Sequence, residues 1–130
     1  DIFSNIFGED VFFAEKQVAI EHMGFFKINY RYLPLGYDIV FENDRGMFSI
    51  EIYDNEGAHN LLCRIEKFDN ETTIENVKNA IQILKRILQK NDFYLYVTRG
   101  GKLYKKKDQY YKRVKDLTEL MEDNDGRRKG

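Results

Sequence analysis

Apolar and polar side chains alternate one by one over most of the chain between residues 25 and 68. The alternating segments are residues 25–32, 37–42, 48–53 and 61–66, separated by turns at 33–36 and 43–46 and by a polar loop that ends after Gly57. A period of two residues is typical of a strand with one buried face. The sequence therefore predicts a four-stranded antiparallel meander that is apolar on one side.

Helical patterns flank this region. Residues 2–7 predict one or two helical turns ending at Gly8, and residues 9–23 predict a helix ended by Gly24, a residue suited to the left-handed C′ position. A Thr-x-x-Glu capping box at residues 72–75 precedes the most regular amphipathic pattern in the chain. Its apolar positions are Ile74, Val77, Ala80, Ile81, Leu84, Ile87 and Leu88. We expect this helix to cover the apolar face of the meander.

The C-terminal third predicts a second hairpin and a last helix. The hairpin begins near Phe93, turns at Gly100-Gly101 and returns through Tyr104. Asp108 is the expected N-cap of a helix that carries Tyr110, Val114, Leu117 and Met121. The predicted fold class is α+β, with a four-stranded meander plus a C-terminal hairpin in an antiparallel sheet and helices packed on one face. Residues 1–122 form the single expected domain, and the polar residues 123–130 form a disordered tail.

Composition limits the classes of function. The 130 residues carry a net charge of −1, so no global field attracts nucleic acid or membrane. The longest apolar runs are far shorter than the roughly 20 residues that a membrane-spanning helix needs. The single cysteine excludes an internal disulfide and fits a reducing compartment. With no secretory leader pattern at residue 1, we expect a cytoplasmic protein.

Residue patterns typical of enzymes, cofactor sites and metal sites are missing from the sequence. Cys63 falls on the inward register of the fourth alternating segment, and His22 and His59 belong to no ligand motif. Gly100-Gly101-Lys102 lacks the spacing of a phosphate-binding loop, and no nucleophile elbow occurs. We expect no catalytic activity, no cofactor and no metal.

The charges are separated along the chain. Residues 1–56 contain eleven acidic and four basic residues, whereas residues 92–130 contain eleven basic and seven acidic ones. A four-residue turn at 43–46 would place Phe41 opposite Phe48, Ile39 opposite Ile50 and Asp38 opposite Glu51. The neighbouring turn would pair Arg31 with Asp38 and Lys27 with Glu42, and Arg64 would compensate Glu51.

Acidic residues at the tips of the meander stay unpaired in this register. The candidate partner-binding residues are Asp44, Glu51, Tyr53, Asp54 and Glu56. Together with the open sheet face they predict a surface that binds another protein, steered by opposite charge and anchored by aromatic side chains.

The basic hairpin gives a second candidate, binding of single-stranded nucleic acid. The residues concerned are Tyr94, Tyr96, Arg99, Lys102, Lys105 and Lys107. Tyrosine rings flanked by lysines can stack on bases and contact phosphates. The same lysines would also protect an edge hairpin against strand-to-strand association. Because the whole chain is slightly acidic, the structural role is favoured over nucleic-acid binding.

A compact α+β chain with the run 37–46 (YDIVFENDRG), a capped amphipathic helix and no catalytic set resembles the small cytoplasmic immunity proteins of bacterial polymorphic-toxin systems. The likeness is one of general layout and carries no site residue across. It implies a protein that neutralises a cognate toxin by binding it directly. The expected oligomeric state is a monomer or homodimer.

Overall fold

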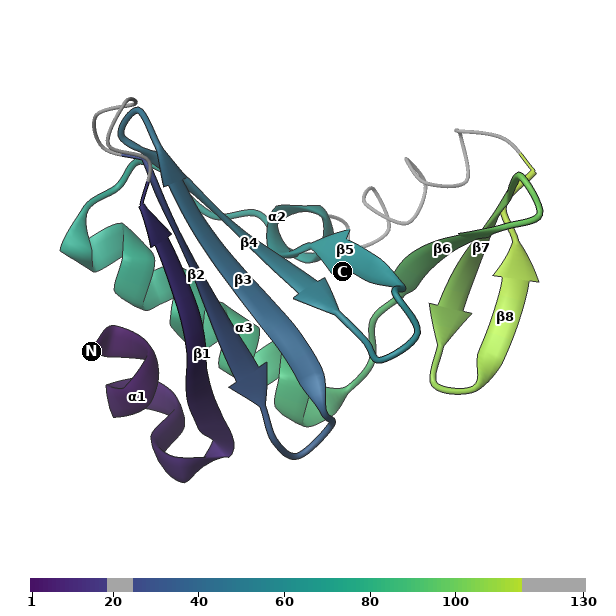
Figure 1. The fold of residues 1–130 in the computed structure, drawn as a ribbon, viewed down its shortest axis with the longest axis horizontal. Helices are drawn as coiled ribbons and strands as arrows, with labels where there is room; N and C mark the ends of the chain where they lie inside the picture. Colours follow the sequence, from purple (N-terminus) through teal and green to yellow (C-terminus); the bar gives the residue numbers. More distant parts are fainter. Residues whose placement is uncertain (19–24, 116–130) are drawn as a thin grey trace.

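The computed structural model describes residues 1–18 and 25–115 of the chain. In chain order the elements are α1 (Ile2–Phe7), the 3₁₀ turn η1 (Gly8–Asp10), β1 (Val11–Val18), β2 (Phe26–Tyr32), β3 (Tyr37–Asp44), β4 (Met47–Tyr53), β5 (His59–Leu61), α2 (Leu62–Ile65), α3 (Ile74–Lys90), β6 (Leu95–Arg99), β7 (Lys102–Lys107) and β8 (Tyr110–Arg113). Every strand pairs antiparallel with its neighbours in sequence, so the sheet order runs from β1 to β8 (Figure 1). The α+β class with an antiparallel sheet is confirmed, but the sheet contains two strands, β1 and β8, that the sequence pattern did not predict.

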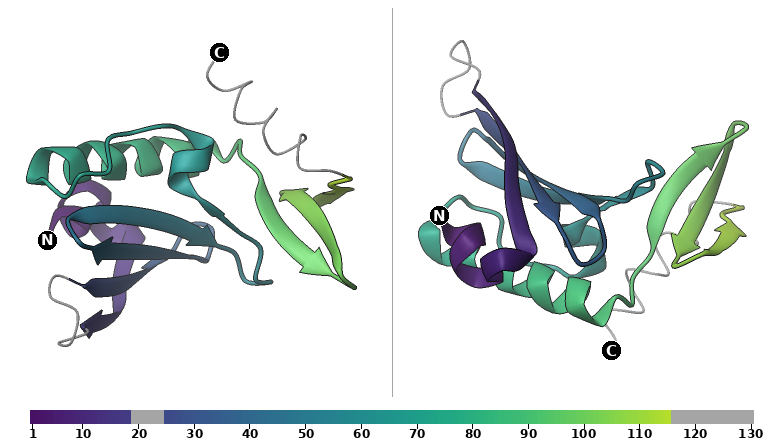
Figure 2. Two further views of the ribbon diagram at one scale, coloured as in Figure 1. Left: turned by 90° about the horizontal axis from the view of Figure 1, so that it is seen from above. Right: turned by 60° about the horizontal axis from the view of Figure 1, so that its bottom comes forward.

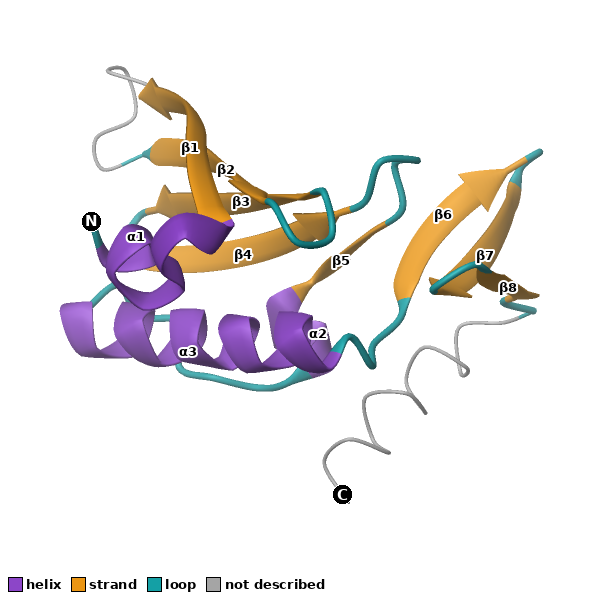
Figure 3. Cartoon of the chain, turned by 90° about the horizontal axis from the view of Figure 1, so that it is seen from below, coloured by secondary structure: helices purple, strands orange, loops and turns teal. Residues whose placement is uncertain are grey.

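Helices α1 and α3 lie on the same side of β1–β4, which we name the inner face (Figures 2 and 3). Alternate strand residues such as Ile39 and Ile50 and the helix residues Ile81 and Leu84 are at most 1% exposed and belong to one apolar core. Burying a side chain of this size stabilises the fold by roughly 1.5–3 kcal/mol relative to leaving it exposed. The side chains of the opposite sheet surface, the outer face, are polar or mixed. Within the described residues, no helix combines the length and apolar character needed to cross a bilayer.

The amphipathic helix begins one residue later than its capping box predicts. The hydroxyl of Thr73 accepts the backbone N–H of Asn76 at 3.1 Å, which makes Thr73 the N-cap of α3. The Thr72 hydroxyl instead donates to the side-chain oxygen of Asn43 and ties the start of the helix to β3. The helix ends at Lys90 and is followed by Asn91, whose left-handed conformation (φ 52°) is typical of a C-terminal cap.

The helix predicted for residues 9–23 is wrong where the structure describes it, because Val11–Val18 forms β1 and pairs with β2. A bulge between Phe13 and Glu15 interrupts the alternation, so the segment lacks the period-two pattern of a regular strand. Phe12 is 60% exposed on this edge strand. Gly24 and the residues that follow Val18 up to it lie outside the described part.

The β3–β4 turn is shorter than predicted and changes the register. It consists of Arg45 and Gly46, both with positive φ (54° and 78°), as in a two-residue type I′ hairpin. Phe41 therefore lies opposite Ile50 instead of Phe48, and Ile39 lies opposite Ile52 instead of Ile50. The expected like-charge pair disappears, because Asp38 faces Tyr53 and Glu51 faces Val40. The β2–β3 register is as predicted, with Arg31 opposite Asp38 and Lys27 opposite Glu42.

The fourth predicted strand, residues 61–66, is wrong over most of its length. The strand β5 ends at Leu61, and Leu62 and Ile65 are buried three residues apart in the single turn of α2. This helical spacing leaves Cys63 exposed, so its inward placement is also wrong.

The C-terminal hairpin turns at Gly100-Gly101 as predicted, which places Tyr96 opposite Lys105 and Arg99 opposite Lys102. Asp108 (φ 60°) lies in a tight turn to β8 and does not cap a helix. Residues 110–113 therefore extend the sheet, because the turn residue takes the left-handed conformation that hairpins require. Leu117, Met121 and the proposed tail at 123–130 lie outside the described residues.

Candidate functional site

The sheet is almost interrupted between β5 and β6, where His59 and Tyr96 form the one residue pair. Strands β6–β8 project away from the plane of β1–β4 at this seam (Figure 2). The Asn60 side-chain amide donates to the Tyr94 carbonyl at 3.0 Å and closes one end of the seam.

A groove of about 600 Å³ lies along this seam. Its lining residues come from β4 to β7: Glu51, Glu56, Gly57, His59, Asn60, Leu61, Arg64, Tyr96, Val97, Thr98 and Leu103. The register places Glu51 with Leu61, and Thr98 with Leu103, on the outer face. A volume of this size is within the range of ordinary ligand-binding sites.

A buried ion pair connects the two sides of the seam. The Lys106 ammonium of β7 lies 2.6 Å from the Asp54 carboxylate in the β4–β5 loop, and their side chains are 8% and 4% exposed. The other Asp54 oxygen accepts the backbone N–H groups of Glu56 and Ala58, each at 2.9 Å. Asp54 therefore shapes the loop on one side and holds the hairpin on the other.

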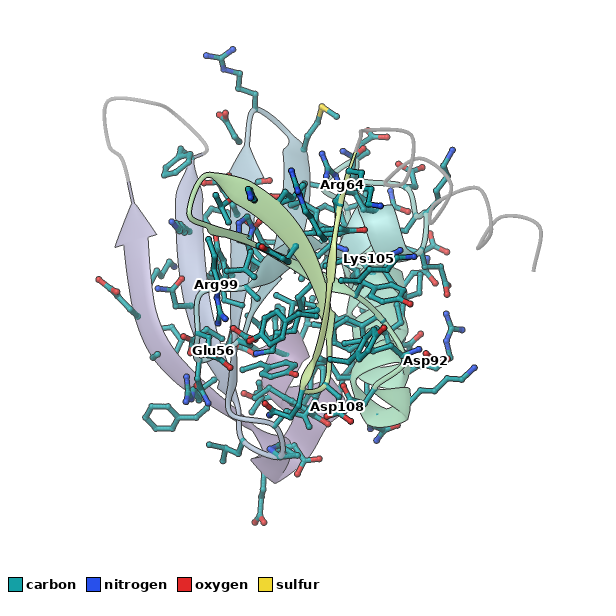
Figure 4. The ribbon with its side chains drawn as sticks, turned by 90° about the vertical axis from the view of Figure 1, so that its right-hand side faces the viewer. Glu56, Arg64, Asp92, Arg99, Lys105 and Asp108 are labelled. Atoms are coloured by element: carbon teal, nitrogen blue, oxygen red, sulfur yellow. The ribbon has the colours of Figure 1, made fainter. Side chains whose placement is uncertain are left out.

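Glu56 extends this pair into a cluster. Its carboxylate accepts hydrogen bonds from Lys106 at 2.8 Å, from Arg99 at 2.8 Å and from the Tyr111 hydroxyl at 3.0 Å. The Arg99 guanidinium also lies over the Tyr111 ring at 4.6 Å, a cation–π arrangement. Figure 4 shows Glu56 and Arg99 on the same side of the hairpin. We name Asp54, Glu56, Arg99, Lys106 and Tyr111 the seam cluster.

The seam cluster shifts the titration of its members. The hydrogen bonds from Lys106 and Tyr111 lower the pKa of the Glu56 carboxylate. Burial alone would lower the pKa of Lys106, but its hydrogen bonds to Asp54 and Glu56 outweigh burial, so that its pKa is raised. Both groups are therefore charged at neutral pH and pair with each other.

A second polar group lies beside the groove on the outer face. The Tyr53 hydroxyl donates to Glu51 at 2.9 Å, and His59 Nδ1 lies 2.8 Å from the other oxygen of the same carboxylate. The Tyr53 and His59 rings stack with centroids 5.2 Å apart. Burial, followed by the hydrogen bond to Glu51, raises the pKa of Tyr53 to about 12.

The predicted partner-binding residues are distributed over different environments. Glu51 and Tyr53 lie together beside the groove, and the exposed Asp44 lies at the far end of β3, 3.8 Å from Arg45. Asp54 and Glu56, expected to be unpaired, are bound in the seam cluster, and the Asp54 side chain is nearly inaccessible. The acidic loop and the basic hairpin thus neutralise each other, which the linear charge distribution did not indicate.

The predicted nucleic-acid residues are divided between two sides of the hairpin. The Lys105 and Lys107 ammonium groups lie over the Tyr94 ring at 4.6 and 5.4 Å. Tyr96 lies opposite Lys105, on the same side of the hairpin, and lines the groove. By register, Arg99 points to the opposite face and binds Glu56, and Lys102 is exposed beside the turn.

Sequence reasoning missed four residues of the site: His59, Arg64, Lys106 and Tyr111. His59 belongs to no ligand motif, and the predicted fourth strand places Arg64 beside Glu51, whereas β4 pairs Glu51 with Leu61. Lys106 alternates with Lys105 and Lys107 and therefore points toward the acidic loop, a signal that the hairpin register already contained.

The polar groups at the seam form hydrogen bonds and ion pairs but offer no recognisable ligand set for an ion. Among the described residues, no three His, Cys, Asp or Glu side chains are grouped as a metal site. Comparisons of this chain with protein-family models, with curated proteins and with solved structures found no match.

Proposed function

We propose that this chain is a non-catalytic protein-binding module whose binding surface is the outer face of β2–β5 together with the seam groove. The observation that carries the proposal is the groove itself, which opens on a face that α1 and α3 do not cover (Figure 3). Its walls are held by ion pairs and hydrogen bonds within the chain. A binding surface that is ordered before association loses less conformational entropy when the partner binds.

The outer face offers the mixture of contacts that protein interfaces use. Half-buried Arg31 and Asp38 form an ion pair at 2.8 Å, and Val40, Tyr53 and Leu61 add apolar and aromatic surface beside it. Aromatic side chains at the centre and charges at the rim are typical of such interfaces. The resemblance to immunity proteins specifies the module further as one that neutralises a cognate bacterial toxin by direct binding.

The test is binding to the product of the neighbouring gene. We expect a toxin-like neighbour whose product forms a stoichiometric complex with this chain, with a Kd at or below about 1 μM by calorimetry. Thr98→Trp would fill the groove without adding a charge and should weaken the complex, while Lys78→Glu on the exposed side of α3 should leave it unchanged. A neighbour product that neither binds nor is neutralised would contradict the immunity function. Equal binding by the Thr98→Trp variant would exclude this surface.

Single-stranded nucleic-acid binding is the alternative, supported by the two lysines that lie over Tyr94. It requires affinity for an oligonucleotide that falls steeply with salt, because phosphate contacts release counterions. Lys105 is only 9% exposed, and Arg99 is bound to Glu56, so fewer cations face solvent than the sequence predicts. We therefore expect no measurable binding of a single-stranded oligonucleotide at low salt.

A further inference from the structure

Four residues that line the seam groove carry a charge or can acquire one: Glu51, Glu56, His59 and Arg64. Glu51 is bound by the Tyr53 hydroxyl and by His59, one at each carboxylate oxygen. Glu56 accepts hydrogen bonds from three side chains of the seam cluster. Both carboxylates of the groove therefore already have their oxygens bound within the chain, and Glu56 also has the cations of Arg99 and Lys106 against it.

Arg64 differs from them. It lies in the last turn of α2, its side chain is exposed, and no carboxylate pairs with it among residues 1–18 and 25–115. In Figure 4 it lies on the side of the hairpin opposite to Glu56 and Arg99. A guanidinium presents donors in a fork that matches a carboxylate, and it stays charged at any physiological pH. Arg64 is thus the charged side chain of the groove that has no partner within the described residues, at the end formed by α2.

The other lining residues of the groove determine the shape of a ligand that can bind in it. It follows the seam past Gly57, His59 and Leu61 on one side and residues 96–98 on the other. Three residues of strand, the length of β5, span about 10 Å, so a short extended segment of similar length fits along the groove. Half-buried Leu61 and Leu103 line the groove and offer apolar contacts next to the guanidinium.

We infer that the seam groove accepts an extended, acidic segment of a partner protein, with a carboxylate of that segment paired to Arg64 and its apolar neighbours against Leu61 and Leu103. The inference rests on the proposed protein-binding function and specifies the chemistry of the partner. It reverses the expectation from the linear sequence, which was a basic partner at acidic loop tips. The reversal follows because the acidic side chains of the β4–β5 loop, Asp54 and Glu56, are already paired within the seam cluster.

The experiment uses three short, end-blocked peptides of one design, with leucine and valine alternating with Glu, Gln or Lys. Each is titrated into the isotopically labelled full chain, and the amide shifts are followed by NMR. We expect the Glu peptide to shift the amides of residues 57–61, 64 and 96–98 saturably. The Gln peptide should bind about tenfold more weakly, the effect of losing one charge-assisted pair.

Charge reversal provides the specific control. Arg64→Glu should exchange the preference, so that the Lys peptide binds better than the Glu peptide, and Arg64→Gln should remove the preference without reversing it. Arg45→Glu makes the same charge change at the exposed β3–β4 turn and should leave the preference for Glu intact. Circular dichroism of each variant checks that the fold is unchanged.

The outcomes separate this inference from the proposed function. Shifts on the outer face with equal affinity for the Glu and Gln peptides, or a preference for Lys in the unmodified chain, would overturn the acidic-segment inference while leaving a protein-binding face. An unchanged preference for Glu in Arg64→Glu would overturn it in the same way. Absence of shifts with all three peptides would overturn the inference and also remove the groove from the proposed function.

Discussion

Replacing Lys106 by methionine should destabilise this protein more than replacing any exposed lysine of the same hairpin. Methionine keeps most of the length and apolar character of the side chain but removes the ammonium group. Asp54 would then remain only 4% exposed at its side chain with no cation against its second carboxylate oxygen. It would keep the two backbone N–H bonds, from Glu56 and Ala58, on the first.

The expected loss of unfolding free energy in Lys106→Met follows from the contacts that Asp54 loses and keeps. Removing one partner of a buried ion pair costs ~3–5 kcal/mol, because the other charge is left uncompensated. Two backbone hydrogen bonds remain on Asp54, so we expect the lower end of that range, about 3 kcal/mol. This is a large share of the roughly 5–15 kcal/mol that stabilises an ordinary domain.

Equilibrium unfolding in urea at pH 7, followed by circular dichroism, measures this loss. Lys102→Met is the matched control, because Lys102 is exposed on the same strand, and it should change the unfolding free energy by less than ~0.5 kcal/mol. The double variant Asp54→Asn/Lys106→Met retains an oxygen for the loop N–H groups and buries no unpaired charge. We expect it to be more stable than Lys106→Met by about 1–2 kcal/mol.

Two results would refute this reasoning. A loss below ~1 kcal/mol in Lys106→Met would mean that the pair behaves as a solvated surface pair. A double variant no more stable than Lys106→Met would mean that the uncompensated Asp54 charge is not the source of the loss.

Three other measurements test individual features. The lowered pKa of Glu56 contributes stability that is present above pH 4.5 and is lost as the pH falls through the folded-state pKa. The urea midpoint of Glu56→Gln should therefore fall less on acidification than that of the unmodified chain. The same dependence of the urea midpoint on pH in both proteins would contradict this role of Glu56. Tyr53, with a pKa of about 12, should ionise well above pH 10 in a near-ultraviolet titration, and the stability that this raised pKa contributes should be lost as the pH rises from 10 to about 12. Glu51→Gln should move the titration midpoint of Tyr53 toward 10. An unmoved midpoint would exclude the hydrogen bond to Glu51 as a cause of the raised pKa. Arg45→Asn should stabilise the chain by ~0.5–1 kcal/mol in urea, because asparagine adopts the positive φ of this turn at lower cost; a lower urea midpoint would contradict this account of the turn.

The parts of the fold that the sequence predicted are those where one local rule acts alone. Strands β2 to β4 and helix α3 have periodic apolar residues on one face, and the Gly100-Gly101 turn fixed the β6–β7 register. The failures occur where two local rules compete. The bulge after Phe13 breaks the alternating pattern, so the sequence does not predict strand β1. The β3–β4 turn has two residues, with Arg45 in a left-handed conformation, whereas the sequence predicts a four-residue loop.

The sequence singled out some residues of the candidate site but not their arrangement. Glu56 and Arg99 were both singled out, as members of two alternative binding surfaces, and the structure places them 2.8 Å apart. Charge counts along the sequence do not show that the acidic β4–β5 loop lies next to the basic hairpin. The hairpin register, together with the alternation that points Lys106 toward the loop, contained the missing information.

The near interruption of the sheet at the seam has a consequence for how the protein opens. Each strand contacts its sequence neighbours, so most of the sheet can form from local hairpins without long loop closure, which favours rapid folding. Strands β6–β8 are joined to β5 by one residue pair, whereas β6 and β7 share five. In hydrogen exchange, we therefore expect the amides of β6–β8 to exchange together as a cooperative unit, at a lower free energy than those of β2–β4. The groove would then open and close with that unit, and its lifetime would be set by the unfolding of a hairpin.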